Sequence, residues 1–282
     1  MTAPGIRCVP VTGIGEVTPG TDLAGVIATC TALEDGDVVV VTSKVVSKAE
    51  GLVVATDKAT ALAEETDRVV ARRGATAVVR TRHGLVMAGA GIDASNTAPG
   101  TVVLLPRRPD ASARELRAAL HARTGHNVAV VVTDTSGRAW RNGQTDIAIG
   151  AAGLAVLHDY AGRDDHYGNR LAVTAPAVAD EIAAAADLVK GKLAGCPVAV
   201  LSGLESWVLP PDRHGPGATA LVRDEDQDMF GLGAREAVRL AVAGDPGVRG
   251  FGLPASADEV RETLEETVGA RTDVRAPDLV EV

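Results

Sequence analysis

The segment NVAVVVTD (127–134) has five apolar residues in a row, Val128 to Val132, before it ends in polar, turn-prone residues. A short apolar run of this kind is typical of a strand that is buried on both faces of a sheet. Two further segments, DVVVVTSK (37–44) and PVAVLSGL (197–204), show the same pattern. The sequence therefore predicts a sheet whose central strands lie in the protein interior.

Helical patterns alternate with these strands along the chain. The expected helices cover 59–74 with a stop at Gly74, about 110–123 with a stop at Gly125, 175–192, 224–244 and 256–268. Shorter strands are expected at 75–80 and 85–90, and the stretch 209–220 is rich in Pro and Gly, which indicates a loop. This alternation predicts an α/β (mixed α+β) fold, without fixing the order of the strands.

The composition restricts the kind of protein that this chain forms. Hydrophobic residues make up 46% of its 282 residues but aromatic residues only 2%, so the core must be packed from Ala, Val and Leu. The net charge of −9 repels polyanions and argues against nucleic acid as a partner. The absence of a signal peptide and of a long apolar run predicts a soluble, cytoplasmic protein that does not enter a membrane.

The composition also changes after Pro246, where an acidic amphipathic helix and a polar tail are expected. We therefore predict a main domain over residues 1–245 and a C-terminal helical extension over residues 246–282. No GxGxxG or GxxxxGK[ST] motif occurs, so a nucleotide would have to bind by a route other than a Rossmann or P-loop site.

The most polar segment between apolar strands is DTSGRAWRNGQTD (134–146). Asp134 and Thr135 offer a carboxylate and a hydroxyl of the kind that Mg²⁺ or Mn²⁺ prefers, and Arg138 and Arg141 suit a phosphate or a carboxylate. The alternative is an Asp-capped turn with solvated arginines, and the residues themselves leave these two interpretations about equal.

Four weaker clusters are consistent with the same chemistry. Asp93 and Asn96 follow a Gly/Ala run and could complete a metal site, but an Asx turn explains them as well. The segments TSKVVSKAEG (42–51), GIGE (13–16) and RHGPGAT (213–219) could contact phosphates, although each is equally a helix start or a surface turn.

Four segments taken in order closely resemble the coenzyme F420-0:L-glutamate ligase family. They are VVVTSKVVSKAEG, RHGLVMAGAGIDASN, VVVTDTSGRAWRNGQTDIAIGAAGLAVLHDYAGRDDHYGN and ADEIAAAADLVKGKLAGCPVAVLSGL, within a resemblance that runs from about residue 6 to 240. The segment from Asp134 to Gly150 is the most specific part of it.

The resemblance implies a family-specific α/β ligase fold and an intertwined homodimer. It implies GTP as co-substrate, Mg²⁺ or Mn²⁺ as the metal, and a monovalent cation such as K⁺ as helper. The substrates would be L-glutamate and the lactyl-phosphodiester tail of the deazaflavin coenzyme precursor, to which one or more glutamates are added. The carboxylate of the tail would attack the γ-phosphate of GTP, and the glutamate amine would then displace phosphate from the acyl phosphate.

Carried over by motif, the resemblance places nucleotide and metal contacts on specific residues. The nucleotide contacts fall on Gly13, Ile14, Gly15, Glu16, Ser43, Lys48 and Asn96, with a loose match at 214–221, and the metal contacts fall on Asp93, Asp134 and Thr135. Lys48 would act as a point charge on the phosphates, and we assign Arg138 and Arg141 to phosphate or to the glutamate carboxylate. The chain lacks the nitroreductase-like domain fused to some members, so only ligase activity is expected.

Two other functions remain open from the sequence. One is a related carboxylate–amine ligase with a different acceptor, and the other is a non-catalytic nucleotide- or metal-binding module. A purely structural protein is disfavoured because the polar segment 134–146 would be costly to bury between apolar strands without a ligand.

Overall fold

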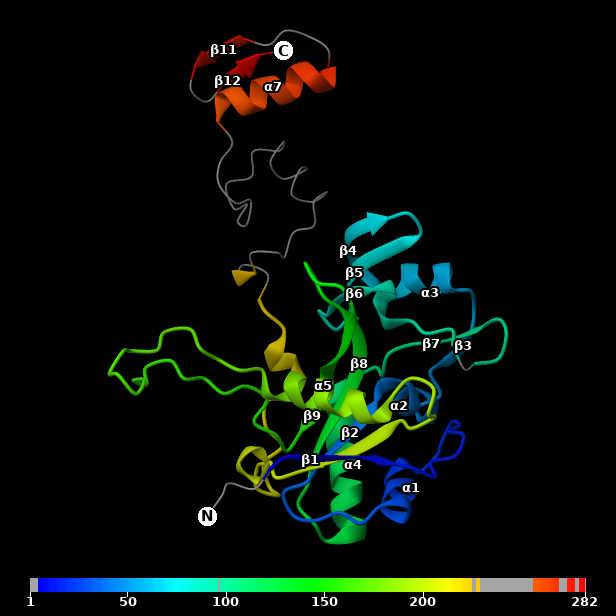
Figure 1. Ribbon diagram of the computed structural model, residues 1–282. Helices are drawn as coiled ribbons and strands as arrows, with labels where there is room; N and C mark the ends of the chain where they lie inside the picture. Colours follow the sequence, from blue (N-terminus) through cyan, green and yellow to red (C-terminus); the bar gives the residue numbers. More distant parts are fainter. Residues whose placement is uncertain are drawn as a thin grey trace. The chain divides into compact units, whose positions relative to one another are not determined.

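The structure is a computed structural model that describes residues 5–95, 97–224, 227–228, 256–268, 273–276 and 279–281 (Figure 1). The chain divides into two compact units, Met1–Arg223 and Asp224–Val282. The boundary expected from the sequence at residue 245 lies outside the described residues, so the division into residues 1–245 and 246–282 stays a prediction.

The first unit is built around a five-stranded sheet with the strand order β1-β10-β2-β8-β9. The strands are β1 (Arg7–Val11), β10 (Val198–Ser202), β2 (Val38–Thr42), β8 (Ala129–Gly137) and β9 (Gln144–Ala152). β2 and β8 pair in parallel, and the other three pairs are antiparallel. The three apolar segments of the sequence are thus confirmed as the three interior strands of the sheet.

Helices cover both faces of this sheet, which explains why its central strands are apolar throughout (Figure 1). Val39 and Val41 share one apolar cluster with residues of α1 (Leu23–Cys30) and α4 (Pro109–Thr124). Val38 and Val40 share another cluster with residues of α5 (Val178–Lys190). All four valines have no exposed surface, and the resulting helix–sheet–helix layers confirm the mixed α/β class.

Helix α4 follows the signals in its sequence. It begins with Pro109, which has no backbone N–H group; this costs nothing in the first turn of a helix, where N–H groups have no partner within the helix. Its C-cap Gly125 has a left-handed φ of 76°. The expected helices at about 110–123 and 175–192 are therefore confirmed as α4 and α5.

Between α2 (Ser43–Ala49) and α4 the chain forms two small sheets. One joins β3 (Val53–Ala55) to β7 (Thr101–Val103), and the other has the order β4-β5-β6, with β4 (Thr66–Arg73), β5 (Thr76–Thr81) and β6 (Val86–Ala88). The helix α3 (Lys58–Glu65) and the 3₁₀ turn η1 (Gly89–Gly91) complete this part. The strands expected at 75–80 and 85–90 are confirmed as β5 and β6, with small shifts of their bounds.

The helix expected over 59–74 is correct only as far as Glu65. From Thr66 the chain forms β4, which pairs antiparallel with β5 and places Val69 opposite the fully buried Val79. The β-branched residues of this stretch favour a strand once a partner strand is available, and this pairing overrides the helical spacing.

After β9, residues 155–177 extend from the sheet as an arm without a regular helix or strand (Figure 1). Two 3₁₀ turns, η2 (Glu205–Trp207) and η3 (Ala218–Leu221), follow β10. Most of the stretch 209–220 is loop, as expected.

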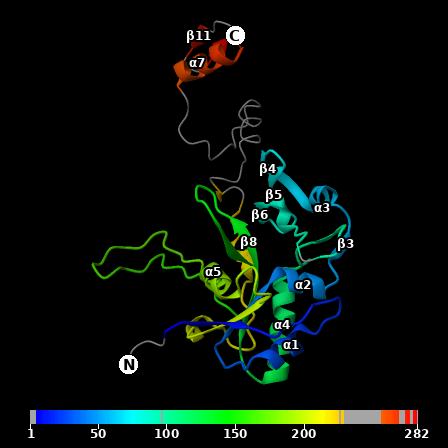
Figure 2. The ribbon, with the colours of Figure 1, turned by 45° about the vertical axis from the view of Figure 1, so that its right-hand side comes forward.

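The second unit contains α7 (Ala257–Val268), followed by the antiparallel pair β11 (Asp273–Ala276) and β12 (Leu279–Glu281) (Figure 2). The helix expected at 256–268 is confirmed, whereas the expected polar tail contains two paired strands. Nearly all of the helix expected at 224–244 lies outside the described residues. In the described part of the chain, no helix combines the length and the apolar character needed to cross a bilayer.

Candidate active site

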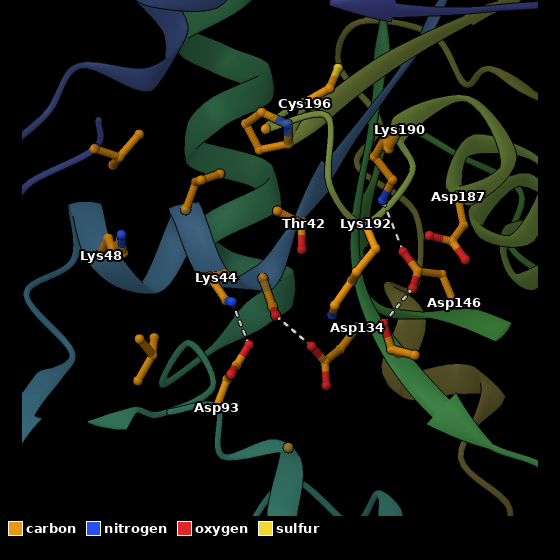
Figure 3. A pocket seen from close by; sticks show the side chains of 18 of the residues that line it. Thr42, Lys44, Lys48, Asp93, Asp134, Asp146, Asp187, Lys190, Lys192 and Cys196 are labelled. Atoms are coloured by element: carbon orange, nitrogen blue, oxygen red, sulfur yellow. Dashed lines mark hydrogen bonds and ion pairs between the residues drawn. The ribbon is translucent and has the colours of Figure 1, made fainter. Parts of the chain in front are cut away.

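A cavity of about 860 Å³ opens where the parallel pairing of β2 and β8 ends, at Thr42 and Thr133 (Figure 3). The two strands run in the same direction, so the polar residues after Thr42 and Thr133 meet there although they are far apart in sequence, while β8 itself continues to Gly137. Further walls come from segments 14–17, 91–93, 103–105 and 187–197. The sequence motifs at 13–16, 42–51 and 134–146 therefore contribute to one site.

Asp134 lies in the wall of this cavity and accepts a hydrogen bond from Ser43 Oγ at 2.8 Å. The pKa of Asp134 is raised to about 6, mainly by burial; the Ser43 hydrogen bond lowers it, and the nearby carboxylates of Asp146 and Asp93 raise it. A cation bound near Asp134 would offset the repulsion from the other two carboxylates and stabilise the ionised form of Asp134.

Asp93 reaches the same cavity from the loop after η1. Its carboxylate forms an ion pair with Lys44 and accepts a hydrogen bond from the backbone N–H of Ser95 at 2.6 Å. Burial alone would raise the pKa of Asp93, but the contacts with Lys44 and Ser95 outweigh it and lower the pKa. Figure 3 shows Lys44 directed at Asp93, at the side of the cavity where Asp134 lies.

Beside Asp134, the cavity wall contains a buried polar network centred on Asp146. Its Oδ2 accepts hydrogen bonds from Lys190 Nζ and Thr133 Oγ1, both at 2.9 Å, and its Oδ1 accepts one from Thr135 Oγ1 at 2.9 Å. The Asp146 and Lys190 side chains are at most 5% exposed. The Thr135 hydroxyl proton therefore points to Asp146, which leaves the oxygen lone pairs of Thr135 available on its other side.

Lys48 lies on α2, and its ammonium contacts Glu16 Oε1 at 2.5 Å. This contact connects the 13–16 motif to the 42–51 motif. Ile14, Gly15 and Glu16 line the cavity, whereas Gly13 does not line it. Gly13 has a φ of +86°, which only glycine adopts readily, and it provides the turn that brings the next three residues to the cavity. Asn96, the remaining predicted nucleotide contact, lies outside the described residues.

Arg138 and Arg141 do not line the cavity. Both are exposed at the tip between β8 and β9, and Arg138 Nη2 donates a hydrogen bond to the Asn142 carbonyl at 2.7 Å. The two arginines are close to Asp134 in sequence, but the hairpin carries them beyond the cavity. The structure therefore gives no support to a catalytic role for either arginine within this cavity.

The loop 213–221 is also absent from the cavity wall. The buried Arg117 fixes the start of this region by donating hydrogen bonds to the carbonyls of Leu209, Pro210 and Arg213 at 2.9–3.1 Å. Carbonyl oxygens turned inward toward a guanidinium group indicate a structural role at this point. The glycine-containing segment 191–197 lines the cavity in its place and carries the exposed Lys192.

Sequence reasoning missed three contributors to the site, namely Lys44 as the partner of Asp93, Asp146 and Lys190. Lys44 and Asp146 lie inside motifs that the sequence did single out. Lys190 lies at the end of α5, 44 residues from Asp146, and no local pattern connects the two.

The donor set fits a divalent cation that is shared with phosphate oxygens. Within the described residues, no cluster of three or more His, Cys, Asp and Glu side chains forms a complete ligand cage. Asp93 and Asp134 nevertheless face a common space, with the Thr135 hydroxyl beside them. Mg²⁺ commonly binds in this way, through one or two carboxylates together with substrate phosphates and water.

Comparison with known proteins shows the family of the chain. Residues 13–203 match the family described as F420-0:Gamma-glutamyl ligase. The chain is 41% identical over 250 residues to a protein of Methanopyrus kandleri named coenzyme F420:L-glutamate ligase, covering 80% of this chain and 98% of that protein. Proteins of the same name from Archaeoglobus fulgidus and Halobacterium salinarum are 39% and 42% identical, over 80% and 69% of this chain and 96% and 86% of their own lengths.

The matched region contains every described element that lines the cavity, from Ile14 to Pro197. The chain therefore belongs to the F420-0:Gamma-glutamyl ligase family and is a ligase.

Proposed function

We propose that this ligase uses GTP to join the amine of L-glutamate to the carboxylate of the coenzyme F420 precursor. The proposal is carried by one observation, the cavity in which Asp93 and Asp134 face each other while Lys44 and Lys48 approach from α2. The names of the relatives support glutamate and the F420 precursor as substrates.

The reaction requires activation, because a carboxylate does not acylate an amine at neutral pH. In the proposed first step, a carboxylate oxygen of the acceptor attacks the γ-phosphorus of GTP, the bond to the bridging oxygen breaks, and GDP leaves. In the second step the glutamate amine attacks the acyl carbon, phosphate leaves, and the amine loses a proton. Both steps move negative charge onto phosphate oxygens, so cationic groups around the phosphates stabilise their transition states.

We assign each cavity residue a role in these two steps from its position. Asp93 and Asp134 would hold a divalent cation, Mg²⁺ or Mn²⁺, which when bound neutralises charge on the phosphates. Lys48 would contact phosphate oxygens as a point charge, and Ser43 orients the Asp134 carboxylate through its hydrogen bond. The segment 191–197 closes the opposite wall, so we assign the phosphate tail of the nucleotide to the space between α2 and this segment. A monovalent cation such as K⁺ remains part of the proposal as an activator.

We also propose that the active form is a homodimer. The arm over residues 155–177 carries Tyr167 and Val173, whose exposed fractions are 88% and 91%. An arm without its own core that exposes large apolar side chains is suited to packing on a second copy of the chain. Sedimentation of the purified protein tests this point, and a monomer at micromolar concentration contradicts it.

Mass spectrometry of the products tests the function directly. With GTP, Mn²⁺ or Mg²⁺, K⁺, L-glutamate and the F420 precursor, the acceptor is expected to gain one or more glutamyl residues, and GDP and phosphate are expected in equal amounts. Asp134→Ala should abolish product formation, whereas Glu262→Ala on the exposed surface of α7 should leave it unchanged. Phosphate release with another carboxylic acid, but none with the F420 precursor, would show that the acceptor is wrong.

A further inference from the structure

Two charged side chains at the α5 end of the cavity have no part in the reaction as proposed so far. Most charged side chains of the cavity wall contact a neighbour, and these contacts are Lys44 with Asp93, Lys48 with Glu16, Lys190 with Asp146, and Asp134 with Ser43. Asp187 and Lys192 also line the cavity, but neither side chain forms a hydrogen bond or an ion pair within the described part of the chain. The α5 end of the cavity therefore presents an unpaired carboxylate and an unpaired ammonium group.

The chain turns sharply between these two residues. α5 ends at Lys190, and the backbone N–H of Gly191 still donates to the Asp187 carbonyl at 3.0 Å. Gly191 has a φ of +60°, which favours glycine, and after it the chain leaves the helix with Lys192 lining the same cavity as Asp187. Figure 3 shows the Lys192 side chain directed into the cavity, and Asp187 on the α5 side of Asp146.

The stability of the fold does not account for an aspartate at position 187. Asp187 lies in the last turn of α5, where the carbonyl end of the helix dipole disfavours negative charge. Burial raises the pKa of its carboxyl group and the Asp146 carboxylate raises it too, while Lys190 and Lys192 lower it to a smaller extent. A carboxylate that is disfavoured in this way, and that faces a cavity, is typical of a position kept for a ligand.

The charges of Asp187 and Lys192 match those of an amino acid. At neutral pH an amino acid carries an ammonium group and a carboxylate on the same carbon atom. Asp187 offers acceptors to the ammonium group, and the carbonyl end of α5 adds partial negative charge at the same place. Lys192 offers donors to the carboxylate. Charge-assisted hydrogen bonds of both signs would therefore orient the amino acid in one direction.

We propose that Asp187 and Lys192 form the subsite for the incoming glutamate, with Asp187 on its ammonium group and Lys192 on its α-carboxylate. This inference rests on the proposed function and names the residues that bind its amine substrate. The location suits the reaction. Asp187 is close enough to Asp146 for the two carboxylates to repel each other, and Asp146 accepts a hydrogen bond from Thr135, which follows Asp134 in β8. The attacking nitrogen would thus enter beside the proposed position of the phosphates.

The test separates the two chemical steps with hydroxylamine. This small nucleophile is uncharged at neutral pH and converts an acyl phosphate into a hydroxamate, so it reports the first step without needing the amino-acid subsite. Asp187→Asn and Lys192→Met should each raise the KM for glutamate about tenfold or more, because each removes a charge-assisted hydrogen bond. Their KM values for GTP and the acceptor, and their rates of hydroxamate formation, should stay within about twofold of wild type.

A matched control and a stability measurement separate this role from a structural one. Glu181→Gln is the control, because Glu181 is an exposed carboxylate on the first turn of the same helix and does not line the cavity. Its kinetic values should equal those of wild type. Asp187→Asn should be at least as stable as wild type in urea, because it removes a negative charge from the carbonyl end of α5 and from the neighbourhood of Asp146.

An unchanged glutamate KM in Asp187→Asn overturns the inference and leaves the proposed function intact. A fall in hydroxamate formation as large as the fall in glutamate ligation also overturns it, because the two residues would then serve the phosphates or the acceptor. If the wild-type protein forms neither hydroxamate nor glutamylated product, the proposed function fails together with this inference.

Discussion

Lys190 Nζ lies 2.9 Å from Asp146 Oδ2, and neither side chain is more than 5% exposed. The pair connects the end of α5 to β9, the strand that pairs with the strand carrying Asp134. Through Thr133 and Thr135, which both donate to Asp146, it fixes the side chains on either side of Asp134. A buried ion pair in the wall of the candidate active site thus holds the residues on either side of Asp134 in place.

Removing one partner of this pair should be far more costly than removing both charges. Lys190→Met leaves the Asp146 carboxylate buried without a counterion, and we expect it to lower the free energy of unfolding by about 3–5 kcal/mol. The double variant Lys190→Met/Asp146→Asn should recover part of this loss. Urea denaturation measures both values. The exposed Lys192→Met is the control, and its free energy of unfolding should stay within about 0.5 kcal/mol of wild type. Equal losses in the single and double variants would contradict the prediction.

The raised pKa of Asp134 predicts a pH-dependent stability. Because its folded pKa of about 6 exceeds the unfolded value, Asp134 stabilises the folded state while protonated, and this contribution is lost as the pH rises through 6. With divalent cations chelated, Asp134→Asn should therefore match wild type near pH 4 and exceed its stability by up to about 2–3 kcal/mol above pH 7. Denaturation series at both pH values measure the difference, and Glu262→Gln is the exposed control. A difference that does not change with pH would show that Asp134 is not strained when ionised.

Lys44 competes with a cation for Asp93, since the two form an ion pair at the cavity. Lys44→Met removes this competitor and should raise the affinity for Mn²⁺ by roughly three- to tenfold, the effect of about 1 kcal/mol from a partly exposed pair. Electron paramagnetic resonance of free Mn²⁺ measures the affinity without turnover. Lys58→Met, on the first turn of α3, is the control at a lysine outside the cavity lining. An unchanged or weakened affinity in Lys44→Met would mean that Lys44 supports the metal site.

Gly150 is required by the packing of α4 on β9. A Cβ at this position would lie 2.4 Å from the Pro109 carbonyl oxygen and 2.8 Å from Pro109 Cβ, so Gly150→Ala forces the helix away from the sheet. We expect a loss of about 1–3 kcal/mol in the free energy of unfolding. Gly137→Ala in the same hairpin meets no atom within 4 Å and should change stability by less than about 0.5 kcal/mol. Comparable losses in both variants would point to an effect of the strand itself.

The sequence predicted the core well where the physical signal is local. The runs at 37–44 and 127–134 are apolar because both faces of β2 and β8 are covered by helices. Such a run can be recognised from the residues of one strand, without knowing its partner strands. The end of helix α4 was equally readable, because Gly125 acts on the backbone of its own neighbours. The helix expected over 59–74 failed at Thr66 because β4 depends on pairing with β5, which helical spacing does not reveal.

The candidate site, too, was only partly predictable from the sequence. The sequence by itself determined that polar groups follow the runs of buried valines, and it therefore found the Ser43 hydroxyl just after β2 and the Asp134 carboxylate within β8. Only the tertiary structure decided that Lys44 meets Asp93, that Lys190 meets Asp146, and that the tip with Arg138 and Trp140 extends beyond the cavity. The physical reason is that strand and helix signals act within a few residues, whereas these contacts arise from parallel pairing and helix packing between distant segments.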